Sequence, residues 1–97
     1  MDKIYISGKI TGTTDYMKRF ERVEEELTKK GYVVINPAKV NAQLPLQTSY
    51  DEYMKMSFCM LDMCMGIYMM KGWEDSKGAK MEHQRAREDG KIIFYER

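Results

Sequence analysis

Four short apolar runs, separated by longer amphipathic segments, divide the chain. The runs are rich in β-branched and aromatic residues, which is the composition typical of strands. We expect strands at residues 3–7, 32–35, 65–70 and 91–95. The third run is apolar on both alternating faces, as is usual for an inner parallel strand that helices cover on both sides.

The segment between the first two runs predicts an amphipathic helix. It begins near Asp15, its apolar residues recur at spacings of three and four, and Gly31 can serve as its C-terminal cap. After the second run, Asn36 and Pro37 stop the strand, because proline donates no hydrogen bond to a sheet and restricts the residue before it. We expect a loop from there to about Thr48.

Two further helices are expected in the second half of the chain. Ser49, followed three residues later by Glu52, matches a capping box, and residues 50–64 are rich in helix-forming Met, Lys and Leu. Residues 76–89 are helical in composition and end at Gly90.

The elements therefore follow the order β-α-β-α-β-α-β, which indicates right-handed crossovers between parallel strands. Residues 1–97 contain no linker and no internal repeat, so a single domain is expected. The predicted fold is a small three-layer α/β/α domain of flavodoxin-like or Rossmann-like type, with a four-stranded parallel sheet. Ligands of such sheets bind beyond the carboxyl ends of the strands.

Charge and hydropathy narrow the classes of partner. Sixteen Lys and Arg against fifteen Asp and Glu leave no basic excess for a nucleic-acid polymer or an anionic membrane. The longest apolar stretch, residues 63–70, is interrupted by Gly66 and is far shorter than the roughly 20 residues that span a bilayer. The N-terminus lacks the pattern of a signal peptide. We therefore expect a cytoplasmic protein.

The few cysteine and histidine residues do not predict a metal site. Cys59 and Cys64 lie five positions apart in a predicted helix, and we expect both to be buried thiols without a disulfide. His83 is the only histidine, and we expect it to be a solvated surface residue. Because these residues have no metal-ligand spacing, we expect neither a metal nor another cofactor.

The loop after the first strand is a candidate ligand contact. Residues 7–12 contain two glycines, which let backbone N–H groups approach an anion or a sugar hydroxyl closely. The loop matches neither a Walker A motif nor the dinucleotide-binding glycine pattern. The alternative is that these glycines only make a turn between a strand and a helix.

The last predicted helix carries a stripe of small residues that includes one carboxylate. At 100° per residue, Gly78, Ala79, Glu82 and Ala86 share one side. Helical side chains lean toward the N-terminus, so Glu82 is expected to point back over Gly78, where the missing side chain leaves room for a ligand. Glu82 then acts as a nucleophile or accepts a hydrogen bond from a ligand hydroxyl. The alternative is a partly buried structural carboxylate paired with Lys or Arg.

Trp73, the only tryptophan, lies in the loop that leads into this helix. There it could stack on a base or close a lid over the ligand. The alternative is a hydrophobic plug over the core.

Several segments together resemble a known domain family. Residues 4–8, 32–38 and 72–82 and the last strand resemble the DUF4406 family of domains of unknown function, common in phages and bacteria. That family is similar to the nucleoside 2-deoxyribosyltransferases, and the resemblance covers nearly the whole chain. It implies that Glu82 attacks the anomeric carbon of a deoxyribonucleoside, displaces the base and forms a covalent sugar intermediate. It also implies that Tyr5 helps to place Glu82.

The resemblance departs from the transferases at two acids. Ser57 and Ser76 stand where the transferases have aspartates. A carboxyl group that protonates the departing base contributes about 10²- to 10⁴-fold to the rate, which a serine hydroxyl does not supply at neutral pH. We expect the remaining ligand contacts from Ser7, Gly8, Lys9, Asn36, Ser57, Trp73, Ser76 and Gly78.

Three functions from different classes follow. The first is an N-glycosidic bond hydrolase or a deoxyribosyltransferase-like enzyme for a nucleoside or nucleotide, with Glu82 as nucleophile. The second is a nucleoside- or nucleotide-binding protein with weak or no catalysis. The third is an interaction protein that uses the fold only as a scaffold.

The second predicted helix also suggests an oligomer. It is apolar around most of its circumference, and a helix of this kind is buried on more than one side. Its apolar and sulfur-containing residues are Tyr53, Met54, Met56, Phe58, Cys59, Met60, Leu61, Met63 and Cys64. We expect a homodimer through this helix. The alternative is a monomer in which residues 37–48 cover the exposed side.

Overall fold

The protein, seen in a computed structural model that describes residues 2–97, contains one parallel sheet. Its strand order is β2-β1-β3-β4, so β1 is an inner strand with Tyr5 beside Ile35 of β2 and Ile67 of β3. The four-stranded parallel sheet predicted from the sequence is confirmed, and no strand end differs from the prediction by more than one residue. The strands are β1 (Lys3–Ser7), β2 (Val33–Ile35), β3 (Gly66–Met69) and β4 (Ile92–Tyr95).

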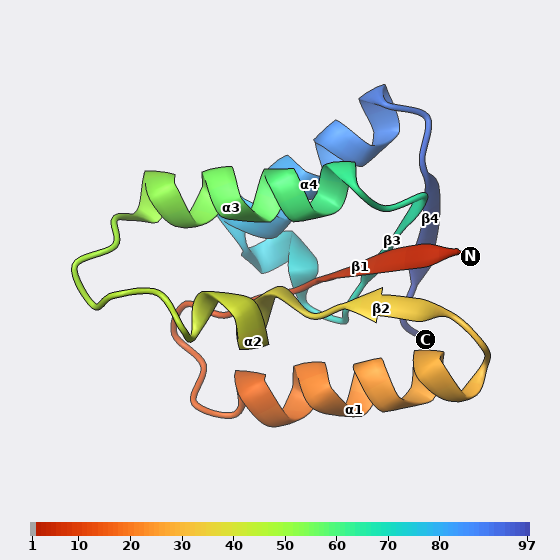
Figure 1. Ribbon diagram of the computed structural model, residues 1–97, viewed down its shortest axis with the longest axis horizontal. Coiled ribbons are helices and arrows are strands. Elements are labelled where there is room, and N and C mark those ends of the chain that lie inside the picture. Colours follow the sequence, from red (N-terminus) through yellow and green to blue (C-terminus); the bar gives the residue numbers. More distant parts are fainter. Residues whose placement is uncertain (1) are drawn as a thin grey trace.

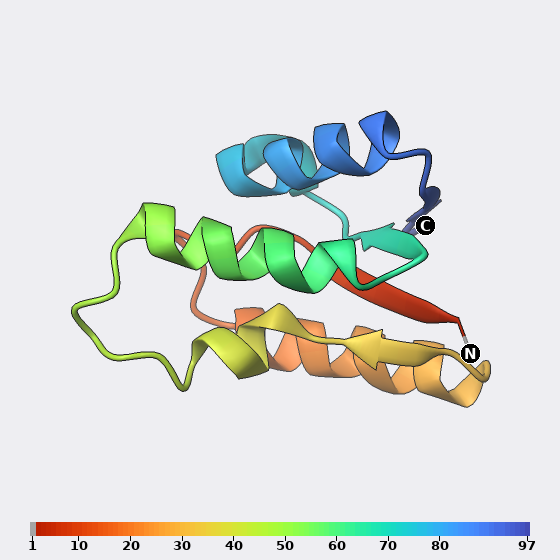
Figure 2. The ribbon, with the colours of Figure 1, turned by 45° about the horizontal axis from the view of Figure 1, so that its top comes forward.

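Helices cover both faces of the sheet and complete the three predicted layers (Figures 1 and 2). Helix α1 (Tyr16–Lys29) lies on one face, and α3 (Tyr50–Asp62) and α4 (Lys77–Glu88) lie on the other. The alternation of side chains along β1 produces this division. Ile4 and Ile6 pack with the α1 cluster, whereas Tyr5 packs with the α3 and α4 cluster.

The helix ends follow the local sequence. Gly31 has a positive φ of 95°, which lets the chain leave α1 while the Tyr32 N–H bonds to the Leu27 carbonyl. The capping box predicted from Ser49 and Glu52 is present in full at the start of α3.

The segment expected to be a loop up to Thr48 begins with a short helix instead. Helix α2 (Pro37–Asn41) follows directly after β2. The Asn36 side chain accepts hydrogen bonds from the N–H groups of Ala38 and Lys39, and Pro37 occupies a first-turn position that needs no N–H donor. The Asn-Pro pair that stops the strand therefore also starts a helix. A turn of 3₁₀ helix, η1 (Trp73–Asp75), precedes α4.

The prediction that both cysteines are buried was wrong for one of them. Cys64 is buried, but Cys59 is exposed, and both thiols are free. Cys59 lies on the side of α3 that faces away from the sheet, because the sheet covers only the side that carries Leu61 and Met60.

The strand order places a switch point between β1 and β3. The connection from β1 leads through α1 on one face, and the connection that enters β3 comes from α3 on the other. Connections that diverge to opposite faces leave a crevice beyond the carboxyl ends of the two strands, where ligands of open α/β sheets bind. Within residues 2–97, no helix has the length and apolarity needed to cross a bilayer.

Candidate functional site

A cavity of about 880 Å³ lies beyond the carboxyl end of β1. It is bounded by the β1–α1 loop, by α2 and the loop after it, by the first half of α3 and by the start of α4. Its volume is in the range of small-molecule sites. Seven of the residues predicted as catalytic or ligand-binding line it, namely Tyr5, Gly8, Lys9, Ser57, Ser76, Gly78 and Glu82.

Glu82 is the most buried charged residue of this wall, with 6% of its surface exposed. Its Oε2 accepts a hydrogen bond from the Tyr5 hydroxyl at 2.5 Å, and its Oε1 accepts one from the Ser7 hydroxyl at 2.6 Å. Within residues 2–97, neither Lys nor Arg forms an ion pair with Glu82. The alternative of a structural salt bridge is therefore wrong, because two neutral hydroxyls hold this carboxylate.

Burial controls the ionisation of this pair. It raises the pKa of Glu82 to about 7, while the hydrogen bonds from Ser7 and Tyr5 offset part of the rise. Burial, together with the charge of Glu82, raises the pKa of the Tyr5 phenol well above its usual range. Tyr5 therefore stays protonated and donates, and Glu82 is divided between its two forms near neutral pH. Carboxyl groups with a pKa shifted in this way, located in a cleft, are typical of functional sites.

A second polar contact extends from Tyr5 toward α2. Ser57, buried on α3, lowers the pKa of Tyr5 by hydrogen bonding and so opposes part of the effect of burial. The Asn41 amide Nδ2 donates in turn to Ser57 Oγ at 3.5 Å. Hydrogen bonds join Asn41 to Ser57 and join both Tyr5 and Ser7 to Glu82, and Ser57 is close enough to Tyr5 to affect its pKa, so these five residues form a row of polar side chains from three helices and the central strand. We refer to these five residues as the polar chain.

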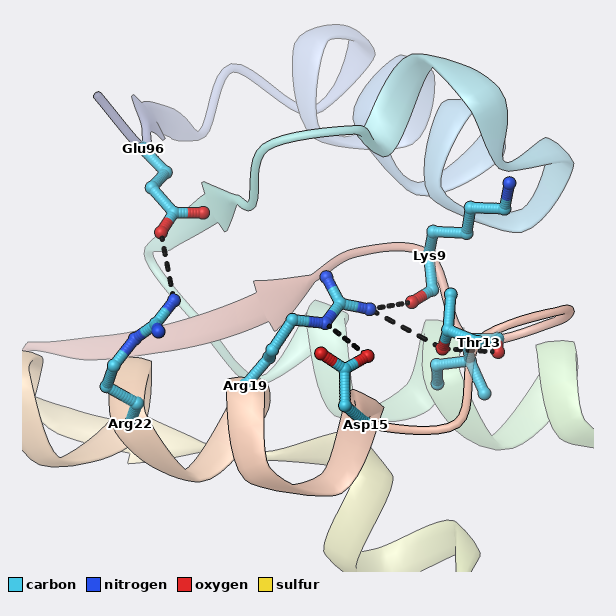
Figure 3. Close-up of polar contacts among 7 residues, drawn as sticks. Lys9, Thr13, Asp15, Arg19, Arg22 and Glu96 are labelled. Carbon is cyan, nitrogen blue, oxygen red and sulfur yellow. Dashed lines mark hydrogen bonds and ion pairs between the residues drawn. The ribbon is translucent and has the colours of Figure 1, made fainter.

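Contacts with Met70 and Arg19 fix the shape of the β1–α1 loop. A Cβ atom on Gly8 would lie 2.9 Å from Sδ of the buried Met70, so close packing requires glycine there. Arg19 donates to the Lys9 carbonyl at 3.0 Å and to Asp15 at 3.2 Å, and Figure 3 shows that the Lys9 side chain turns away from Arg19. The loop therefore holds a defined shape at the cavity edge.

The start of α4 forms the opposite edge. Ser76 caps the helix by accepting a hydrogen bond from the Ala79 N–H at 3.1 Å. Gly78 lines the cavity as expected, but the space beside it is not fully open, because a Cβ there would lie 3.2 Å from both Met54 Sδ and the Tyr50 hydroxyl.

Three predicted contacts do not line the cavity, namely Trp73, Asn36 and Ser7, whose hydroxyl bonds to Glu82 instead. Trp73 is half-buried and packs against the core, where its ring stacks on His83 with centroids 4.3 Å apart. This placement matches the alternative of a hydrophobic plug. His83 was expected to be solvated, but it is half-buried between Trp73 and Tyr95. The distance from His83 Nε2 to the Tyr95 hydroxyl is 2.8 Å. Asn36 caps α2 and donates to Glu24.

Part of the cavity wall was not predicted from the sequence. Three tyrosines, Tyr16, Tyr50 and Tyr53, line it, and so does Asn41. The spacing of Tyr50 and Tyr53, three positions apart at the start of a helix, was the available signal for the α3 contribution. Asn41 gave no signal, since its segment was expected to be a loop.

Among residues 2–97, no cluster of three or more His, Cys, Asp or Glu side chains has a geometry suited to a metal ion. The chemistry that these residues themselves offer is that of a carboxylate held by two hydroxyls.

Comparison with known proteins agrees with the sequence resemblance at the level of the family. None of the curated proteins matches the chain. Residues 2–95 match the family described as "Domain of unknown function (DUF4406)". Because this match covers nearly all 97 residues, the chain belongs to the DUF4406 family.

Proposed function

We propose that this protein cleaves the N-glycosidic bond of a nucleoside or nucleotide with Glu82 as the nucleophile. The observation that carries the proposal is a buried carboxylate that pairs with no Lys or Arg of residues 2–97 and lies at the wall of a cavity large enough for such a ligand. Burial of a carboxylate without a cation is unfavourable for the folded protein. Such unfavourably buried groups at a cavity wall are typical of catalytic sites.

The proposed reaction has two steps. An oxygen of ionised Glu82 forms a bond to the anomeric carbon, and the bond between that carbon and the base nitrogen breaks. The electron pair stays on the base, which takes up a proton. A water molecule, or a second base in a transfer reaction, then attacks the same carbon, the ester bond to Glu82 breaks, and the attacking group gives up a proton.

Tyr5 and Ser7 orient the nucleophile in this scheme. Their two hydroxyls fix the plane of the carboxylate from opposite oxygens. They also stabilise the ionised form, because each lowers the pKa that burial raises. Orientation of a reacting group in this way reduces the entropy cost of reaching the transition state.

The cavity offers only weak general acids to protonate the departing base. Ser57 and Ser76 line the cavity, but hydroxyls are poor general acids at neutral pH. Among the described residues, Asp75 is the other carboxylic residue of the cavity wall. These facts favour slow turnover, and they support the second candidate function, which is binding of a nucleoside or nucleotide without cleavage.

The test uses chromatography to measure the release of free base from a panel of ribo- and deoxyribonucleosides and their 5′-monophosphates. Cleavage by the unaltered protein and its loss in Glu82→Gln support the enzyme. Glu88 is an exposed acid on the same helix, so Glu88→Gln is the matched control and is expected to retain activity. Thermal stabilisation by a panel member without base release supports the binding protein. Neither cleavage nor stabilisation overturns both functions.

We further propose that the protein is a homodimer through α3. The outward side of this helix exposes Met56 and Cys59, Met63 is exposed directly after its last residue, and the segment of residues 37–48 leaves all three uncovered. A second copy of the same helix would bury these adaptable thioether side chains.

A further inference from the structure

One atom of the polar chain lacks a partner. Among the buried side-chain polar atoms of residues 2–97, Oδ1 of Asn41 is the one without a hydrogen bond. The other end of this amide donates to Ser57, and Asn41 itself lines the cavity. Its carbonyl is thus buried in the wall of the cavity that holds Glu82.

An unpaired buried acceptor destabilises the free protein, because the group has lost its hydrogen bonds to water and gained none in return. An apolar residue of similar size would avoid this cost. At a cavity wall, a hydrogen-bond donor on a bound ligand supplies the missing partner.

The position of Asn41 in the polar chain indicates which donor this is. Ser57 connects Asn41 to Tyr5, and Tyr5 donates to Glu82. If Glu82 contacts the anomeric carbon, the sugar hydroxyls are the polar ligand groups that lie a few bonds from that carbon. A sugar hydroxyl can donate to the Asn41 carbonyl, while Ser57, whose one proton is directed at Tyr5, accepts from the Asn41 amide and holds it in place.

We propose that Asn41, held in place by Ser57, forms a subsite that binds a hydroxyl of the ligand's sugar, with Oδ1 of Asn41 as the acceptor. This inference rests on the proposed function, because it takes the ligand to be a nucleoside or nucleotide. Asn41 acts in recognition, and it is not part of the bond-breaking step.

The experiment uses carbocyclic nucleosides, in which a methylene group replaces the ring oxygen, so that cleavage through an oxocarbenium-like state is blocked. Isothermal titration measures their affinity, together with that of analogues that lack each sugar hydroxyl in turn. In the unaltered protein, loss of one particular hydroxyl weakens binding by about tenfold, which corresponds to one lost hydrogen bond to a buried group. Asn41→Leu weakens binding of the full analogue by a similar factor. It does not weaken binding of the analogue that already lacks that hydroxyl.

Thermal unfolding of the free protein separates recognition from a structural role. Asn41→Leu is expected to keep or raise the melting temperature, because it removes an unpaired buried acceptor. Asn41→Ala is the second variant, should leucine crowd the wall. Gln43→Leu, an exposed amide two residues further on, is the matched control and changes neither affinity nor melting temperature.

Two results overturn the subsite. If Asn41→Leu and Asn41→Ala weaken all analogues equally, or none, then the carbonyl is satisfied by solvent or serves only the fold. If the unaltered protein binds none of the analogues, the proposed nucleoside ligand and the subsite fail together. Binding that is independent of Asn41 removes the subsite alone.

Discussion

The Tyr5 hydroxyl lies 2.5 Å from Oε2 of Glu82, although 77 positions separate the two residues in the sequence. Tyr5 is in the middle of the inner strand β1, and its side chain points to the face that α4 covers. Glu82 lies on the side of α4 that also buries Ala79 and Ala86. The contact therefore depends on the strand order, which places α4 on this face of the sheet.

Removal of the Tyr5 hydroxyl is expected to lower the cleavage rate. In Tyr5→Phe, Glu82 loses a hydrogen bond that lowers its pKa, so the pKa rises above about 7 and less carboxylate is ionised at neutral pH. We expect kcat to fall by more than tenfold at pH 7 and the acidic limb of the pH–rate profile to move to higher pH. Stopped assays of base release between pH 5 and 9 measure both effects.

Ser7→Ala is the companion change, because Ser7 donates to the other oxygen of Glu82. It is expected to shift the profile in the same direction. A profile that stays in place in both variants would show that these hydroxyls do not control the ionisation of Glu82.

The buried carboxyl group also makes stability depend on pH. Folding raises the pKa of Glu82 from 4.5 to about 7, so between these values the native state binds more protons than the unfolded state. The free energy of unfolding therefore decreases as the pH rises from about 4.5 to 7, by up to about 3 kcal/mol. Glu82→Gln removes this contribution and is expected to be more stable than the unaltered protein above pH 7. Denaturant titrations at pH 5 and pH 8 test this.

Glu88→Gln serves as the control for these titrations, since Glu88 is exposed on the same helix. Its stability is expected to follow that of the unaltered protein at both pH values. Equal pH dependence in the Glu82→Gln protein would contradict a carboxyl group that folds with a raised pKa.

The location of Glu82 could be predicted from the sequence because it depends on one local pattern. The stripe of Ala79, Glu82 and Ala86 is read directly from helical periodicity, and all three residues are buried. The parallel sheet was equally accessible, because four apolar runs alternate with helical segments. The pairing of Glu82 with Tyr5 was implied by the family resemblance, since no local pattern connects a strand near the N-terminus with the last helix.

Other parts of the site depend on contacts that no local pattern encodes. Asn41 reaches the cavity because α2 turns the chain back toward α3, and this helix was hidden by a proline that also stops a strand. His83 and Trp73 stack on each other after the chain passes through η1. No local pattern shows this contact, so the sequence predicted a solvated histidine and a tryptophan that closes a lid. Exposure of Cys59 depends on which side of an almost uniformly apolar helix meets the sheet.

Gly78 offers a test of the cavity that leaves the reacting groups intact. A Cβ there lies 3.2 Å from Met54 Sδ and from the Tyr50 hydroxyl, both at the ends of side chains that can shift. Alanine also favours a helix by about 1 kcal/mol relative to glycine. We expect Gly78→Ala to keep or slightly raise the melting temperature and to weaken ligand binding, with a larger loss of binding in Gly78→Val.

Lys80→Ala is the control for Gly78, because Lys80 is exposed on the same helix away from the cavity. Affinity measured by thermal shift with nucleosides and their monophosphates is expected to remain unchanged in that variant. Full affinity in Gly78→Val would show that the ligand does not approach the start of α4.

The outward side of α3 is expected to form the contact between two copies of the chain. Met56 and Met63 are 37% and 58% exposed, and because Met63 caps α3 with a helical backbone conformation, seven positions after Met56, the two lie on the same side. Next to them, Arg85 bonds to Asp62 at 2.8 and 2.9 Å, which provides a polar rim for an apolar contact. We expect sedimentation at micromolar concentration to give twice the mass of the chain. Met56→Glu combined with Met63→Glu is expected to give a folded monomer, because the dimer would bury two unpaired charges from each chain.

Met17→Glu provides the control, since Met17 is also 37% exposed but lies on α1, across the sheet. That variant is expected to remain a dimer, and a monomer for the unaltered protein at the same concentration would rule out the interface.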